Sequence, residues 1–269
     1  MKNLYFWEVL VTKNSNDIYL LTNHGVLSGK VITSKRKVTK NPSKAKFYQK
    51  LTKENDSLWL FRMYRRNNQL ASYWYSKTKD SKKRIDKKVS FGLNDSISSI
   101  LFYNDKGEKH GKLSAWFDNG NKSYEGRYVN SKKEGLWRNY FYSGEIAARA
   151  FFKNDSLITE KFYDKNGNER VLKGNYCRKK PEFTGGIKKY KKIIRRLVSK
   201  LKWKIKGTIT VDYTISVTGD LTNIRIYDTL PDNLRQEIIT FFKQIKGWKP
   251  AFNTGRPIPI QHSFKLIFE

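Results

Sequence analysis

A 24-residue repeat in the middle of the chain most strongly limits the folds that this sequence can adopt. Segments 111–120 and 135–144 are rich in aromatic residues, and each begins and ends with glycine. At the same shift, residues 128–131 match residues 152–155. Partial copies start at Phe102 and Phe162. A fixed period with paired aromatics and a turn glycine predicts stacked β-hairpins that bury aromatic side chains between neighbours.

These copies resemble MORN-type repeats of the bacterial variant. The resemblance lies in two adjacent aromatic residues that are followed, after two intervening residues, by glycine, as in residues 116–120 and 140–144. It implies a scaffold for protein interaction and carries no catalytic role. The repeat region is predicted to cover residues 96–178.

Residues 1–95 are predicted to be a β-strand region, because short apolar segments alternate with Asn- and Lys-rich turns and helical periodicity is absent. The predicted strands are 6–12, 17–22, 26–32, 46–50, 59–64 and 70–75. The lysine-rich, apolar-poor stretch Ser76–Lys88 is predicted to be a linker or an exposed loop.

The last part of the chain has the pattern of a small α+β domain. Residues 208–217 alternate apolar and polar side chains, residues 218–220 favour a turn, and residues 224–227 resume a strand, which predicts an antiparallel hairpin. Two helices are predicted from apolar residues that fall on one helical face. The first face comprises Ile187, Tyr190, Ile193, Ile194, Leu197, Val198 and Leu201, and the second Leu234, Ile238, Phe241, Phe242 and Ile245. Residues 257–268 are predicted to form the last strand.

Residues 181–269 resemble the C-terminal domain of TonB-type energy transducers. The resemblance rests on five segments that occur in order, at 181–186, 206–211, 219–224, 248–251 and 255–257. It implies a small antiparallel sheet with helices on one face. In that family the domain reaches from the inner membrane to outer-membrane transporters and couples ion-motive force to uptake. The predicted fold is therefore mostly β plus α+β, with the domains 1–95, 96–178 and 181–269.

The first functional interpretation follows from this resemblance. It is a non-catalytic cell-envelope protein whose TonB-like module binds a protein partner, an outer-membrane transporter segment, by β-strand addition. The final strand is the candidate sheet edge. The candidate partner-binding residues are Ile258, Ile260, His262 and Phe264, although the same residues could simply complete the core.

A second interpretation starts from the formal net charge of +31. Such a charge attracts polyanions such as nucleic acid, lipopolysaccharide or anionic lipid. The lysines are spread along the chain, however, which favours ordinary solvated faces. The helix at 187–201 is read first as a helix that packs on the sheet. The sharper hypothesis is contact with an anionic envelope surface through Lys188, Lys192, Arg195 and Arg196.

The sequence predicts neither an enzyme nor a cofactor or metal site. His24, His110 and His262 lack metal-ligand spacing, and Cys177 is the single cysteine. Asp118 and Asp164 sit in predicted turns, where aspartate bonds to the backbone, so they are not interpreted as a catalytic pair.

The apolar run at residues 1–11 contains Glu8 and lacks a small-residue cleavage site, so it is expected to be neither a signal peptide nor an anchor. No transmembrane helix is predicted. The expected location is the periplasm or cell envelope if an upstream signal exists, and the cytoplasm if Met1 is the true start. In the cytoplasm the third interpretation applies, in which the repeats act as an interaction module.

Overall fold

The computed structural model describes residues 18–20, 31–33, 38–39, 45–65, 68–79, 82–172, 179–201, 207–226, 228 and 230–268. The predicted strand 6–12 lies outside this part of the chain, and the predicted strands 17–22 and 26–32 lie only partly within it. Contacts divide the chain into two compact units, Met1–Asn139 with Arg149–Glu160 and Tyr140–Ala148 with Lys161–Glu269. The predicted domain boundaries stay a prediction.

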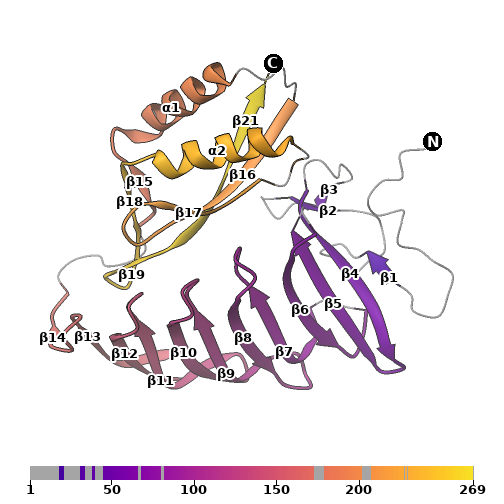
Figure 1. Cartoon of the computed structure of the whole chain (residues 1–269). Helices are drawn as coiled ribbons and strands as arrows, with labels where there is room; N and C mark the ends of the chain where they lie inside the picture. Colours follow the sequence, from indigo (N-terminus) through magenta and orange to yellow (C-terminus); the bar gives the residue numbers. More distant parts are fainter. Residues whose placement is uncertain are drawn as a thin grey trace. The chain divides into compact units, whose positions relative to one another are not determined.

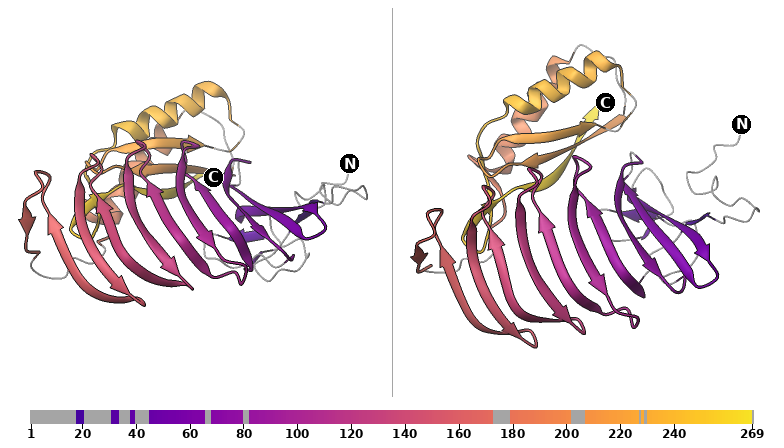
Figure 2. Two further views of the ribbon diagram at one scale, coloured as in Figure 1. Left: turned by 90° about the horizontal axis from the view of Figure 1, so that it is seen from below. Right: turned by 60° about the horizontal axis from the view of Figure 1, so that its bottom comes forward.

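One long antiparallel sheet contains the first fourteen strands (Figure 1). From β4 to β14, each strand lies beside the next one along the chain, as Figure 2 shows for the larger strands. The strands are β1 Ile18–Leu20, β2 Val31–Thr33, β3 Val38–Thr39, β4 Ala45–Asn55, β5 Leu58–Arg65, β6 Leu70–Ser76, β7 Arg84–Phe91, β8 Ile97–Tyr103, β9 Lys109–Trp116, β10 Lys122–Val129, β11 Lys132–Tyr140, β12 Ile146–Lys153, β13 Ser156–Tyr163 and β14 Glu169–Arg170. The predicted mostly-β fold class is confirmed.

The 24-residue period corresponds to two strands and two turns of this sheet. The turn residues Asn130 and Ser131 both have positive φ, as a two-residue turn of type I′ requires, and Asn154 and Asp155 repeat this geometry one period later. The amide of Ser131 donates to the carbonyl of Lys109 at 2.7 Å, and the same bond recurs one period later from Asp155. Each hairpin is therefore tied to the preceding one at equivalent positions.

Aromatic side chains are buried between neighbouring repeats, as the period predicts. Trp137 is buried, and the rings of Tyr128 and Phe152, one period apart, meet it edge-on at 5.1 and 6.1 Å. The ring also fills the space above Gly126, where a Cβ would lie 2.2 Å from it. Glycine at this position therefore allows the indole to lie against the backbone of β10.

Lys88 interrupts an apolar row that crosses the sheet. The residues paired on successive strands in this row are Leu51, Phe61, Trp74, Lys88, Leu101 and Leu113. Phe61 stacks on Trp74 at 5.4 Å, and the amine of Lys88 lies 5.4 Å from the centre of the same indole. Burial, followed by the charge of nearby Arg84, lowers the pKa of Lys88 to about 8.

The prediction that Ser76–Lys88 is a linker is wrong at both ends. Ser76 is the buried last residue of β6, and β7 begins at Arg84 and pairs with β6. Lys79, Arg84 and Lys88 of this stretch lie over aromatic rings, a role that apolar patterning does not register. Arg84 lies 5.0 Å from the centre of the Trp74 ring.

The C-terminal domain packs two helices on one face of a three-stranded sheet with the order β17-β16-β21 (Figure 1). Its elements are β15 Glu182–Phe183, α1 Gly186–Lys200, β16 Gly207–Ile215, β17 Leu221–Ile226, α2 Asp232–Gln244, β18 Trp248–Lys249, β19 Ala251–Asn253, β20 Arg256–Ile258 and β21 Ile260–Phe268. Alternate residues of β16 face the helices, and Val211, Tyr213 and Ile215 are fully buried there. The predicted hairpin and both predicted helices are present.

The predicted last strand, residues 257–268, is divided in two. Arg256–Ile258 pairs with β19, whereas Ile260–Phe268 pairs with β16. Pro259 lies between them and has no N–H to continue a ladder. Within the described residues, neither helix is long and apolar enough to cross a membrane.

We predict that Lys88→Met raises the free energy of unfolding at pH 7 by about 1–3 kcal/mol, because it removes a charge from the apolar row. The pKa of Lys88 rises from about 8 in the folded chain towards 10.5 on unfolding. Between these pH values the unfolded chain binds more protons than the folded chain. The free energy of unfolding of the wild type therefore rises with pH, and its difference from the variant becomes smaller. Denaturant titrations at pH 7, 8 and 9.5 measure this difference.

The matched control is Lys83→Met, because Lys83 is exposed in the same stretch. It should leave the unfolding free energy nearly unchanged at every pH. A Lys88→Met effect that is destabilising, or that stays constant from pH 7 to 9.5, would contradict this account of the row.

Candidate partner-binding edge

β21 is an edge strand of the C-terminal sheet. It pairs with β16 over its whole length, from Ile260 opposite Ile215 to Phe268 opposite Gly207. Among the described strands, no other pairs with it. An edge strand presents unpaired N–H and C=O groups, which can template another strand. The predicted candidate edge therefore lies at a real edge of the sheet.

The register shows which residues of β21 face outwards. The amide of Thr210 in β16 donates to Asp228 at 2.7 Å, on the β17 side, and the carbonyl of Ile226 opposite Val211 accepts from Arg235. Val211 and Ile226 are therefore a non-hydrogen-bonded pair, and the N–H and C=O groups of Val211 point towards β21. By the same alternation, the outward N–H and C=O groups of β21 belong to Gln261, Ser263, Lys265 and Ile267.

The two edges of the sheet differ. At the β17 edge, the Arg235 guanidinium of α2 donates to the carbonyl of Ile226 at 2.5 Å and to that of Asp228 at 3.2 Å. At the β21 edge, no hydrogen bond from another described residue reaches the four outward-facing main-chain positions. The end of the β17 edge is therefore bonded within the domain, whereas the β21 edge carries no such bond among the described residues.

The predicted partner-binding side chains point mostly towards the core. Ile260 and Phe264 pack against the cluster beneath the helices. His262 stacks on Tyr213 with ring centres 5.4 Å apart, and its Nδ1 lies 3.1 Å from the Tyr213 hydroxyl. Ile258 lies in β20, opposite Ala251. That these four residues contact a partner stays a prediction.

A series of hydrogen-bonded side chains links β21 to α1 through β16. The hydroxyls of Tyr190 in α1 and Tyr213 in β16 lie 2.9 Å apart, and Tyr213 reaches His262 in β21. Burial raises the pKa of Tyr213 to about 12 and that of Tyr190 further still. Both hydroxyls therefore keep their protons at neutral pH. These hydrogen bonds connect α1, β16 and β21.

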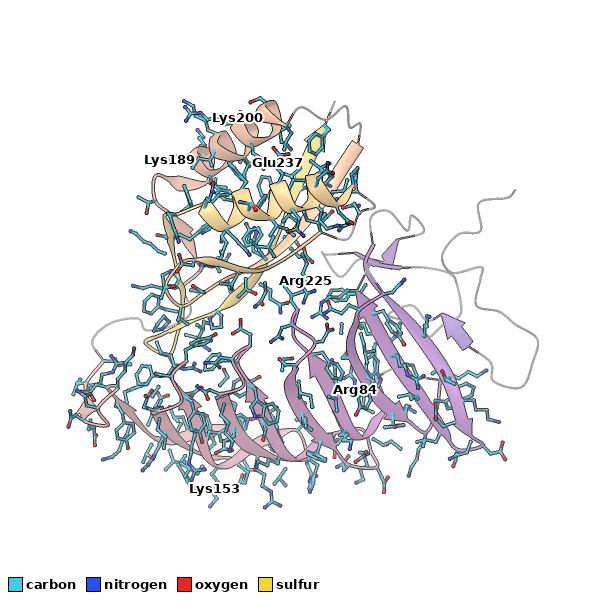
Figure 3. All side chains as sticks on the ribbon, viewed as in Figure 1. Arg84, Lys153, Lys189, Lys200, Arg225 and Glu237 are labelled. Carbon is cyan, nitrogen blue, oxygen red and sulfur yellow. The ribbon has the colours of Figure 1, made fainter. Side chains whose placement is uncertain are left out.

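The predicted polyanion-contact residues all lie exposed on α1. Lys188, Lys192, Arg195 and Arg196 belong to a helix with seven basic residues and no acidic one. Within the described part of the chain, none of the seven pairs with a carboxylate. Figure 3 shows two of these side chains, Lys189 and Lys200, on α1.

The predicted apolar face of α1 is correct except in the first turn. Tyr190, Ile194 and Leu197 are buried in the core, but Ile187 is 51% exposed. The apolar face of α1 therefore extends one turn beyond the part of the helix that packs on the sheet.

The remaining candidates show no catalytic arrangement among the described residues. Nδ1 of His110 lies 3.2 Å from the Asn130 side chain in a hairpin turn. The carboxylate of Asp164 accepts from the amides of Asn166 and Asn168, and its bonds to Asn168 lower its pKa. Within the described residues no cluster could hold a metal ion. His24 and Cys177 lie outside them.

Sequence reasoning found the edge strand but not its outward-facing residues. The alternation of β21 shows that Gln261, Ser263, Lys265 and Ile267 share one face. Whether these residues or the ones between them have outward-facing N–H and C=O groups depends on the contacts of Thr210 and Ile226 with distant residues. No pattern within the strand carries that information.

Comparison with known proteins supports the C-terminal domain only. Residues 201–269 match the family model described as the Gram-negative bacterial TonB protein C-terminal. No curated protein matches the chain. The match begins after α1, so it covers β16 to β21 and α2, including the candidate edge. These residues are similar to the TonB C-terminal family, which indicates a module for protein–protein interaction at the cell envelope.

Solved structures add no argument. The crystal structure of TarM has 19% sequence identity and a TM-score of 0.24, and the match covers 32% of this chain and 16% of TarM. A mutant of S. aureus TarM in complex with fondaparinux, alpha-GlcNAc-glycerol and UDP has 17% identity and a TM-score of 0.24, with 38% and 17% covered. The chain thus spans less than a fifth of either protein, and scores this low do not indicate a shared fold.

We predict that Tyr213→Phe lowers the free energy of unfolding by about 1–3 kcal/mol, because it leaves the Tyr190 hydroxyl without its buried partner. The double variant Tyr190→Phe/Tyr213→Phe removes both hydroxyls and should recover part of this loss. Denaturant titration of the two variants measures it. Equal stability of Tyr213→Phe and wild type would show that the chain of hydroxyls does not hold β21 in place.

Proposed function

We propose that this protein is a non-catalytic binding protein of the cell envelope. Its C-terminal domain binds an extended segment of a protein partner, which adds as a strand to the outer edge of β21. The partner that the family similarity suggests is a segment of an outer-membrane transporter, bound on the periplasmic side. The long sheet would act as a scaffold, in keeping with its resemblance to MORN-type repeats.

The open edge of β21 is the observation that carries this proposal. Four alternate residues present main-chain groups without partners among the described residues, whereas Arg235 bonds two carbonyls at the end of the opposite edge. An added strand would satisfy these groups with hydrogen bonds worth about 0.5–1.5 kcal/mol each. Such bonding gives affinity for any extended segment, and side-chain contacts on either face would give specificity.

The test removes outward-facing N–H groups while leaving the ladder to β16 intact. Gln261→Pro/Lys265→Pro deletes two such groups, and both side chains are exposed. Edge strands tolerate proline where the N–H faces solvent. The variant should keep its circular dichroism spectrum. It should bind short overlapping peptides from outer-membrane transporters about tenfold more weakly than wild type, as two lost hydrogen bonds imply.

The matched control is Gln261→Ala/Lys265→Ala, which removes the same side chains but keeps both amides. It should bind the peptides within about threefold of wild type, because main-chain bonds supply the affinity. Proline at Ile260 would be a poor choice, because its amide bonds to β16. A folded proline variant that binds like wild type, or a wild-type protein that binds none of the peptides, would reject the proposal.

A further inference from the structure

The open edge of β21 and the basic surface of α1 belong to one composite surface. We infer that the segment bound at β21 carries acidic side chains at alternate positions, on the face turned towards α1. This inference rests on the proposed strand addition and names the chemistry of the partner. It also joins two sets of residues that the sequence analysis treats as separate sites.

The two helices lie over different strands of the sheet. α1 lies against β15 and β21, and its Tyr190 ring meets the ring of Phe264 in β21 at 5.4 Å. α2 lies against β17, at the other side of the sheet. Both helices cover the same face, so a strand added beyond β21 would extend the sheet beneath the flank of α1 (Figure 1).

Only alternate side chains of the added strand could meet α1. Successive side chains of a strand point to opposite faces of the sheet. Every other residue of the bound segment would therefore point to the helix face, and the residues between would point to the open face. Only the first set comes within reach of the long basic side chains of α1.

The two helices differ in charge. α1 carries seven basic residues and no acidic one, whereas α2 balances Arg235 and Lys243 against Asp232 and Glu237. β21 contains no carboxylate, and its Lys265 points to the sheet face opposite α1. Basic charge is thus concentrated on the helix beside the open edge rather than spread evenly over the domain. In the described part of the chain no carboxylate neutralises it.

Basic residues lie on both flanks of α1. At about 100° per residue, the buried stripe of Tyr190, Ile194 and Leu197 has Lys191 and Arg195 on one side. The other side has Lys189, Arg196 and Lys200, while Lys188 and Lys192 point away from the sheet. Whichever flank lies above the added strand therefore presents at least one cation to its acidic side chains.

An acidic segment fits this surface better than a neutral one. A neutral strand at the β21 edge would leave the cations unpaired, whereas carboxylates at alternate positions would meet them directly. Single surface ion pairs contribute little, but several together raise the association rate and select against basic partners. The expected contribution over a neutral segment is about tenfold in affinity at low salt.

The experiment compares three synthetic peptides of equal length with the full-length protein. The first alternates glutamate with valine, the second has the same composition with all glutamates in one block, and the third alternates glutamine with valine. Fluorescence anisotropy at low salt should show the first peptide binding about tenfold more tightly than the other two. Raising the salt to several hundred millimolar should remove most of this difference.

Charge reversal on α1 then assigns the effect to the helix. Lys189→Glu/Arg196→Glu/Lys200→Glu changes one flank, and Lys191→Glu/Arg195→Glu changes the other. The variant on the flank above the added strand should lose the preference for the alternating acidic peptide and keep affinity for the glutamine peptide. Reversal of Lys106, Lys132 and Lys153, three exposed lysines of the long sheet, controls for net charge and should retain the preference.

The outcomes separate this inference from the proposed function. Equal binding of all three peptides would overturn the inference and leave strand addition standing. Binding of none would overturn both. Loss of the preference in the long-sheet control as well would show that overall charge, and not α1, selects the peptide. Retention of the preference by both α1 variants, with loss of binding to phosphatidylglycerol vesicles, would assign the helix to a lipid surface and overturn the inference.

Discussion

The pairing of β16 with β21 is the constraint on which the candidate site depends. The two strands match residue for residue over nine positions, from Gly207 opposite Phe268 to Ile215 opposite Ile260. A shift of one residue would turn the apolar side chains of β21 to solvent and bring the outward-facing amides inwards. The buried contact of His262 with Tyr213, and of Tyr213 with Tyr190, opposes such a shift. The same register therefore closes the core and determines which amides stay open at the edge.

Basic residues serve different purposes in the two parts of the chain. In the long sheet, Lys109 lies over the Tyr128 ring and Lys133 over the Phe152 ring, one period apart. Lys88 lies within an apolar row, and its burial there lowers its pKa. These cations support packing, since they cover aromatic rings that the sheet would otherwise expose. On α1, by contrast, the basic residues contact neither an aromatic ring nor a carboxylate among the described residues, which is the basis for proposing an acidic partner.

The sequence predicts the elements well where periodicity is strong. The 24-residue repeat predicts stacked hairpins, and the alternation at residues 208–217 predicts β16. It fails where charged residues replace apolar ones, as at Arg84 and Lys88 in β7, because their role depends on Trp74 in the neighbouring strand. It also fails at Pro259, where one predicted strand becomes two with different partners. The open edge could be located from the sequence, but its outward-facing residues depend on Thr210 and Ile226, whose partners lie elsewhere in the fold.

Residue-resolved amide hydrogen exchange of β21, measured by NMR with and without the alternating glutamate–valine peptide, tests the central claim most directly. In the free protein the amides of Gln261, Ser263, Lys265 and Ile267 should exchange fast, and those of His262, Phe264 and Leu266 should exchange slowly. With peptide bound, the first set should become protected while the second set changes little. Slow exchange of the first set in the free protein, or protection that does not alternate along the strand when peptide binds, would contradict an open edge that accepts a partner strand.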